Sequence, residues 1–137
     1  MAAEKILIVD DEIDTINLLE MVLKMSGYQV IKALTGADCL RLAREERPNL
    51  IILDIMMPQL SGMDVLKQLV KTYGSPPVIL FSARNQIPDV ISGMDAGAFR
   101  YLVKTASREQ LLQTIKAALE QHREKNISED DWRSKWE

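Results

Sequence analysis

The sequence has little of three features that would place a protein in a class at once: cysteine, long apolar runs and excess positive charge. A single cysteine, Cys39, excludes an internal disulfide. No apolar run approaches the roughly 20 residues of a transmembrane helix, and the first residues, MAAEK, do not resemble a signal peptide. The 137 residues carry a net charge of −3, which does not favour nucleic-acid binding. We therefore expect a soluble cytoplasmic protein that by itself binds neither nucleic acid nor membrane.

What the sequence does contain is an alternation of short apolar runs with segments of helical period. The runs KILIV, QVIKA, LIIL, VILF and FRYLV occupy Lys5–Val9, Gln29–Ala33, Leu50–Leu53, Val78–Phe81 and Phe99–Val103. Three of them are almost wholly apolar, as is typical of strands covered on both faces. Five βα repeats predict an α/β fold with a parallel sheet and helices on both faces. Periodicity alone leaves the order of the strands open.

Turn and cap residues agree with these boundaries. Gly27 can end the first helix. Ser61 is followed three residues later by Asp64, and Ser107 by Gln110. Both pairs resemble a capping box at a helix start. The predicted helices therefore begin and end where the apolar periodicity begins and ends.

The carboxyl-terminal segment differs in character from the rest. We predict a domain over residues 1–122 and a polar tail, or the start of a linker, over residues 123–137. Trp132 and Trp136 lie four residues apart and would share one face of a short helix, for which Ser128 is a candidate start. Packing on the domain, pairing with another chain and a linker all remain open for this tail.

Polar residues stand at the end of four of the predicted strands. Asp10 and Asp11 follow the first strand, Asp54 the third, Ser82 the fourth and Lys104 the fifth. In open α/β sheets, ligands bind beyond the carboxyl ends of the strands. If these strands are neighbours, one crevice collects three carboxylates, a hydroxyl and an ammonium.

This set of groups has a chemical interpretation. Carboxylates that face one another need a cation, and Mg²⁺ prefers oxygen ligands. An aspartate can act as a nucleophile toward a phosphoryl donor, while a lysine and a hydroxyl hold the phosphoryl oxygens. Taken singly, each residue has a simpler use: an acidic pair after a strand is usually a helix cap, and a lone serine or lysine belongs to a turn or the surface. Their joint placement at four strand ends favours a site.

Four segments, ILIVDDE, LIILDIMMPQLSGMDVL, VILFSA and AGAFRYLVK, together resemble the receiver domain of two-component response regulators of the chemotaxis-regulator type. The resemblance covers about residues 4–122 and includes Pro58 and Gly62, which lie four and eight residues after Asp54. It implies a flavodoxin-like fold with strand order 2-1-3-4-5. It also implies that Asp54 accepts a phosphoryl group from a phosphohistidine of a sensor histidine kinase or phosphotransfer protein.

The resemblance also implies roles for further residues. Asp11, Asp54 and the backbone carbonyl of Met56 would bind Mg²⁺, for which Mn²⁺ can substitute, and Asp10 would act through a water. Lys104 would pair with Asp54 and then with the phosphoryl group.

A switch is implied as well. Ser82 would hydrogen-bond a phosphoryl oxygen, and Tyr101 would turn inward into the space that Ser82 leaves. The surface of the fourth helix, fifth strand and fifth helix would then change shape. A downstream protein, an output domain missing from this chain, or a second copy in a homodimer would read that change.

One position departs from the family pattern, and two others, Met56 and Arg84, bear on the lifetime of the phosphorylated state. Lys104 is followed by Thr105 where the family usually has proline after a cis bond. Because a cis bond before a non-proline residue costs roughly 3 kcal/mol, we predict a trans or strained Lys104–Thr105 bond and a loop of different shape. Met56 offers no side chain to orient a water and Arg84 could cover the phosphoryl group, so we expect slow self-dephosphorylation.

Two other functions remain open. A phosphohydrolase would use the same aspartate and Mg²⁺ chemistry as a turnover enzyme, but Met56 cannot serve as the acid or base that such enzymes need. An inactive receiver-like interaction module would not need Asp11, Asp54, Ser82 and Lys104. The leading expectation is a phospho-accepting switch, either stand-alone or separated from its output domain, that is not a turnover enzyme.

Overall fold

The computed structural model describes residues 3–57, 61–72, 75–83 and 86–134, with side chains as far as Arg123. Strands and helices alternate along the chain. In order they are β1 (Lys5–Val9), α1 (Ile13–Met25), β2 (Gln29–Ala33), α2 (Gly36–Glu46), β3 (Leu50–Leu53), α3 (Gly62–Lys71), β4 (Val78–Ser82), α4 (Ile87–Asp95), β5 (Arg100–Val103) and α5 (Arg108–Ser134). The five predicted strands are confirmed, each to within one residue at either end.

The strands form one parallel sheet in the order β2-β1-β3-β4-β5. The predicted flavodoxin-like topology is therefore confirmed. Backbone hydrogen bonds continue the pairing past the strand ends, from Asp10 N to the Ala33 carbonyl at 3.2 Å and from Asp54 N to the Val9 carbonyl at 3.0 Å. These bonds hold the residues that follow β1 and β3 at one edge of the sheet.

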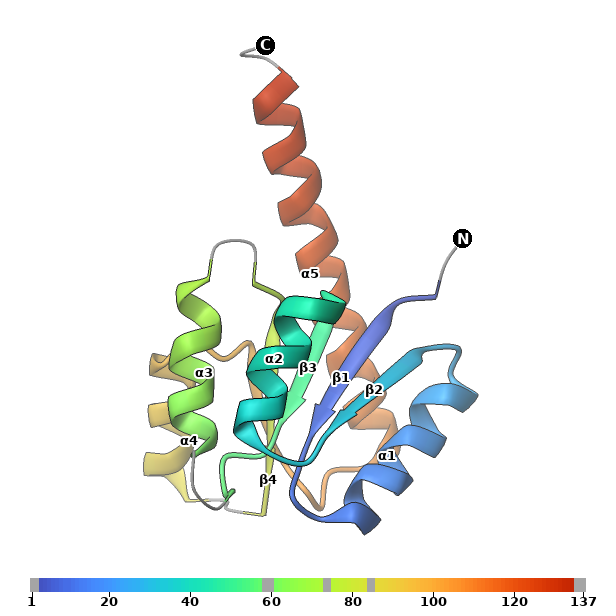
Figure 1. Cartoon of the computed structure of the whole chain (residues 1–137), viewed down its shortest axis with the longest axis vertical. Coiled ribbons are helices and arrows are strands. Elements are labelled where there is room, and N and C mark those ends of the chain that lie inside the picture. The colour runs from blue at the N-terminus through green and yellow to red at the C-terminus, as the bar shows by residue number, and fades with distance from the viewer. Residues whose placement is uncertain (1–2, 58–60, 73–74, 84–85, 135–137) are drawn as a thin grey trace.

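Two apolar cores lie on opposite faces of the sheet, because successive side chains of a strand point to opposite sides. Ile6 and Ile8 of β1 pack on one face with α1 and α5, whereas Leu7 and Val9 pack on the other face with α2 and α3. Cys39 of α2 is fully buried in the second core. Figure 1 shows this doubly wound arrangement, with α5 behind the sheet and α2 in front of it.

The predicted caps are present. The Ser61 hydroxyl accepts a hydrogen bond from Asp64 N at 3.3 Å, and the Ser107 hydroxyl accepts one from Gln110 N at 3.0 Å. Gly27, two residues after the end of α1, has a φ of 93°, a conformation in which residues with a Cβ are strained. The Lys104–Thr105 bond is trans, as predicted, since the described residues include no cis peptide bond.

Helix α5 is longer than the sequence led us to expect. It continues to Ser134 as one helix of 27 residues, so a separate helix begun at Ser128 is wrong. Residues 123–134 contain neither glycine nor proline and include several good helix formers, so nothing local stops the helix. In Figure 1 its last turns extend well past the sheet. Among the described residues, none of the helices combines the length and apolar character that crossing a bilayer requires.

Candidate functional site

The carboxyl ends of β1, β3, β4 and β5 meet at one edge of the sheet, as the strand order requires. Three polar side chains there are almost completely buried: Asp10 is 1% exposed, Asp54 3% and Ser82 0%. Burying a carboxylate is unfavourable unless a cation or hydrogen-bond donors compensate for the lost water. The partners of these groups therefore define what the site can do.

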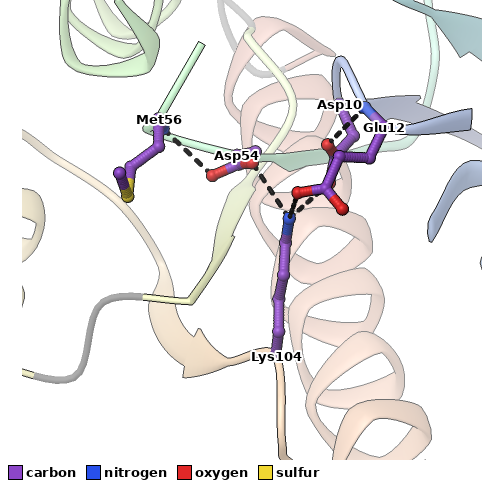
Figure 2. Close-up of polar contacts among 5 residues, drawn as sticks. All are labelled: Asp10, Glu12, Asp54, Met56 and Lys104. Carbon is purple, nitrogen blue, oxygen red and sulfur yellow. Dashed lines mark hydrogen bonds and ion pairs between the residues drawn. The ribbon is translucent and has the colours of Figure 1, made fainter.

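Lys104 supplies one compensating cation. Its Nζ lies 2.9 Å from Oδ2 of Asp10, 3.0 Å from Oδ2 of Asp54 and 3.5 Å from Oε1 of Glu12. The lysine follows β5, where its backbone N donates to the Ser82 carbonyl at 2.8 Å. Figure 2 shows its side chain pointing toward all three carboxylates. One ammonium thus joins residues from the ends of β1 and β3.

The charge state of Lys104 is set by opposing effects. Burial by itself lowers the pKa of Lys104, since it disfavours the charged form. The carboxylates of Asp10 and Asp54, whose Oδ2 atoms lie 2.9 and 3.0 Å from its Nζ, act in the other direction and prevail, so the pKa of Lys104 is raised above its ordinary value. The lysine is a permanent cation at neutral pH and cannot act as a base there.

The loop after β3 fixes the Asp54 carboxylate. Oδ1 of Asp54 accepts a hydrogen bond from Met56 N at 3.0 Å, so its two oxygens face different partners. Gly62 closes this loop, with its N donating to the Ile55 carbonyl at 3.2 Å. A Cβ built on Gly62 would lie 2.3 Å from the Asp54 carbonyl oxygen. The start of α3 therefore approaches the loop as closely as only glycine allows.

An acidic cluster, formed by Asp10, Asp11 and Glu12, adjoins the Lys104–Asp54 ion pair. Oxygens of Asp10, Asp11 and Glu12 all lie within 4.8 Å of one another. Oδ1 of Asp10 accepts a hydrogen bond from Glu12 N at 2.9 Å. Its buried Oδ2 accepts no hydrogen bond within the described part of the chain, because the contact with Lys104 is an ion pair whose geometry falls outside that of a hydrogen bond. An under-satisfied buried oxygen and a set of hard carboxylate donors fit a divalent cation such as Mg²⁺.

Ser82 and Tyr101 occupy neighbouring strands. Ser82 ends β4 between the strand that leads to Asp54 and the strand that leads to Lys104. Tyr101 of β5 is half-buried against the core on the α2 and α3 side. Gly93 of α4 lies beside its ring, since a Cβ there would be 3.3 Å from Tyr101 Cδ2. A rotation of the Tyr101 ring would thus alter what α4 packs against.

The sequence identified most of these residues but missed one contact. It paired Lys104 with Asp54 alone, whereas the structure also pairs it with Asp10. Glu12 stands at the N-cap position of α1 and at the rim of the site, where its side chain is 66% exposed. Arg84, expected over the phosphoryl group, lies outside the described residues. Asp54 stands apart from the acidic cluster and reaches it through Lys104.

Comparison with known proteins agrees with this geometry. The chain is 44% identical over 117 residues to the uncharacterized transcriptional regulatory protein YkoG of Bacillus subtilis and 40% identical over 119 residues to the transcriptional regulatory protein PrrA of Mycobacterium tuberculosis. These matches cover 85% and 87% of this chain but 51% of each relative. The chain therefore spans about half the length of these curated relatives.

Solved structures extend the comparison to the fold. A receiver domain protein from Methanospirillum hungatei, described as CheY-like, matches 90% of this chain and 99% of its own with a TM-score of 0.85 and 27% identity. A receiver domain protein from Clostridium thermocellum matches 90% of this chain and 98% of its own with a TM-score of 0.82 and 31% identity. The family profile described as response regulator receiver domain matches residues 6–116. The chain belongs to the response regulator receiver domain family.

Proposed function

We propose that this chain is a phospho-accepting switch of a two-component system and that Asp54 is the phospho-acceptor. The observation that carries the proposal is the buried Asp54 carboxylate, 3% exposed, with one oxygen 3.0 Å from the Lys104 ammonium and the other 3.0 Å from Met56 N. A carboxylate held in this way is oriented, as a nucleophile must be.

In the proposed reaction, one Asp54 oxygen attacks the phosphorus of a phosphohistidine. The new P–O bond forms as the P–N bond breaks, and the imidazole nitrogen leaves and takes up a proton. Negative charge spreads over the phosphoryl oxygens during transfer, and Lys104 lies where it can neutralise part of it. Phosphoryl transfer of this kind relies on positioning and charge rather than on an added base.

Mg²⁺ is the proposed cofactor, and Mn²⁺ is expected to substitute. Asp11, Asp54 and the Met56 backbone carbonyl would hold it directly, and Asp10 through a water. A bound divalent cation would neutralise charge on the phosphoryl group and on the carboxylates. The close spacing of Asp10, Asp11 and Glu12 supports this assignment, since like charges at such distances repel.

The proposed output runs through Ser82 and Tyr101. The Ser82 hydroxyl would move toward the new phosphoryl oxygens to donate a charge-assisted hydrogen bond. Tyr101 would then turn inward, which changes the surface of α4, β5 and α5 because its ring lies beside Gly93. Phosphorylation would shift the populations of two existing states rather than create a new one.

The proposed partners follow from this chemistry. A sensor histidine kinase or phosphotransfer protein would supply the phosphoryl group in the cytoplasm. The α4-β5-α5 surface would act on a downstream protein, on an output domain or on a second copy. YkoG and PrrA are named transcriptional regulatory proteins, and this chain matches only 51% of each, which supports an output domain beyond residues 1–122. Residues 123–137 would be a tail or linker, and turnover of a substrate is not part of the proposal.

The test is phosphorylation followed by intact mass. The protein is incubated with Mg²⁺ and acetyl phosphate, or with a phosphorylated histidine kinase, as wild type, as Asp54→Asn and as Asp95→Asn. We expect a stoichiometric phosphoryl adduct on wild type and on Asp95→Asn, whose exposed side chain lies at the end of α4. We expect no adduct on Asp54→Asn.

The alternatives give different results. Multiple turnover of a small phosphate ester would indicate the phosphohydrolase. Absence of any adduct on folded wild-type protein, with either donor, would indicate the inactive module. An adduct that survives in Asp54→Asn would assign the acceptor to another residue. A phosphorylated lifetime of seconds would contradict slow self-dephosphorylation.

A further inference from the structure

Two adjoining hollows lie at the amino ends of the strands, the edge of the sheet opposite the acidic site. One, of about 650 Å³, lies where β4 and β5 begin, between α3 and α5. The other, of about 750 Å³, lies between α2 and α3. Both are lined by Ser75, Pro76 and His122, so they form one continuous depression, which we call the amino-end groove. Figure 1 shows α5 leaving the sheet at this edge.

Among the residues that the structure describes, the charged side chains that line the amino-end groove are all arginines. Arg44 and Arg47 line one hollow, Arg100 lines the other, and His122 lines both. Among the described residues that line either hollow, none is an aspartate or glutamate. Because the whole chain carries a net charge of −3, this grouping is not the average of its surface.

Neighbouring acids do not neutralise Arg44 and Arg47. Glu45 pairs with Arg41 at 3.1 Å, and Glu46 pairs with Lys5 at 3.2 Å. Within the described part of the chain, the side chains of Arg44 and Arg47 form neither hydrogen bonds nor ion pairs. Two guanidinium groups therefore remain available at the rim of one hollow. A guanidinium is the side chain best suited to bind phosphate through paired hydrogen bonds.

The backbone conformation of Arg47 gives an independent reason to expect a function for its side chain. It ends α2 with φ 47° and ψ 62°, the left-handed conformation that glycine normally supplies at this position. It is the one non-glycine residue with positive φ among those the structure describes. A Cβ in this conformation is strained, and such strain persists most often where the side chain has a use.

We propose that the amino-end groove binds a phosphorylated small molecule of nucleotide size. Arg44 and Arg47 would hold its phosphates, and the half-buried apolar side chains of Leu40 and Pro76 would contact its less polar part. The volumes of the hollows lie within the range of small-molecule sites in proteins. Because the groove and Asp54 lie at opposite edges of the sheet, this site is separate from the proposed phospho-acceptor.

The test is calorimetric titration with ADP, GDP and pyrophosphate in a buffer that contains EDTA, which removes metal from the acidic site. We expect at least one nucleotide to bind wild type, and pyrophosphate to bind more weakly. Arg47→Gly and Arg44→Gln should each weaken binding by roughly tenfold or more. Arg47→Gly should also raise the thermal midpoint, since glycine relieves the strain.

Two controls make the result specific. Arg41→Gln removes a charge from the same helix at a residue that does not line the groove, and it should leave affinity unchanged. Asp54→Asn should also bind as wild type does, so failure of the proposed phospho-acceptor would not affect this result. The proposal is overturned if neither nucleotide binds, if pyrophosphate binds equally well, or if Arg41→Gln weakens binding as much as Arg47→Gly.

Discussion

Lys104 shows at the scale of a single residue how tertiary partners decide the charge of a group. Burial alone would favour the neutral amine, yet Asp10 and Asp54 raise the pKa of Lys104 and keep it charged. Asp10 and Asp54 in turn are tolerated in an almost dry environment because this cation lies about 3 Å from each. Removing Lys104 would leave two buried carboxylates without this cation, which is among the more damaging changes in proteins.

Cys39 provides a residue-scale prediction about pH. Burial raises the pKa of the Cys39 thiol to about 12, whereas an unfolded cysteine ionises near about 8.5. Between these values the folded chain holds a proton that the unfolded chain has lost, so the free energy of unfolding falls as pH rises. From about pH 7.5 to about pH 10 we expect Cys39 to account for a loss of roughly 2 kcal/mol.

Urea unfolding of wild type and Cys39→Ala at the two pH values measures this contribution. The alanine variant is destabilised by its missing sulfur at both values, but its stability should fall less between them. Parallel losses in the two proteins would show that the thiol does not titrate in this range.

At the scale of elements, the position of each strand in the sheet explains how apolar its sequence is. β1 and β3 are central and almost wholly buried, and both are apolar runs. β2 is an edge strand whose residues are mostly exposed or half-buried, and its sequence includes Gln29 and Lys32. The interior strands β1 and β3 are therefore apolar up to their carboxyl ends, and the polar residues of the acidic site follow directly after them.

The junction of β3 and α3 gives an element-scale prediction. In Gly62→Ala the new Cβ would meet the backbone of Asp54 and Ile55 at 2.3 Å, so α3 or the Asp54 loop must shift. We expect a destabilisation of about 2–3 kcal/mol and slower formation of the phosphoryl adduct. Chemical denaturation and time-resolved intact mass measure the two effects.

Gly93→Ala is the matched control. Its Cβ would lie 2.5 Å from Leu80 Cδ1, the end of a side chain that can rotate, and alanine favours a helix interior. It should therefore cost less than Gly62→Ala. If the two variants lost equal amounts of unfolding free energy, the close approach of the backbone at Gly62 would not be the reason that this position requires glycine.

At the scale of the whole molecule, the two edges of the sheet differ in charge. The carboxyl edge holds Asp10, Asp11, Glu12 and Asp54 with one lysine, whereas the described lining of the amino-end groove is cationic. Parallel strands make this separation possible, because all of them place their carboxyl ends at the same edge. A ligand at one edge need not compete with a ligand at the other.

Metal binding should stabilise the whole molecule. A ligand that binds only the folded chain adds about 2.7 kcal/mol when its free concentration is 100-fold above its dissociation constant. We therefore expect Mg²⁺ to raise the thermal midpoint and EDTA to reverse the rise. Asp11→Asn should abolish the shift, whereas Asp14→Asn, an exposed acid in the first turn of α1, should retain it. Retention of the full shift in Asp11→Asn would remove that residue from the proposed ligands.

The sequence by itself determined the strands, the caps and the identities of Asp10, Asp11, Asp54, Ser82 and Lys104. These features are local: apolar runs, polar residues after them and capping patterns depend on a few neighbouring residues. The length of α5 was missed because a polar sequence without glycine or proline is compatible with either a linker or a helix.

Only the tertiary structure decided which groups meet. The ion pair between Lys104 and Asp10 joins residues that are far apart in the chain, and it depends on the strand order, which periodicity leaves open. The amino-end groove likewise combines Arg44, Arg100 and His122 from three different parts of the chain. Periodicity records which residues are buried, whereas contacts across the sheet are set by how the βα units pack.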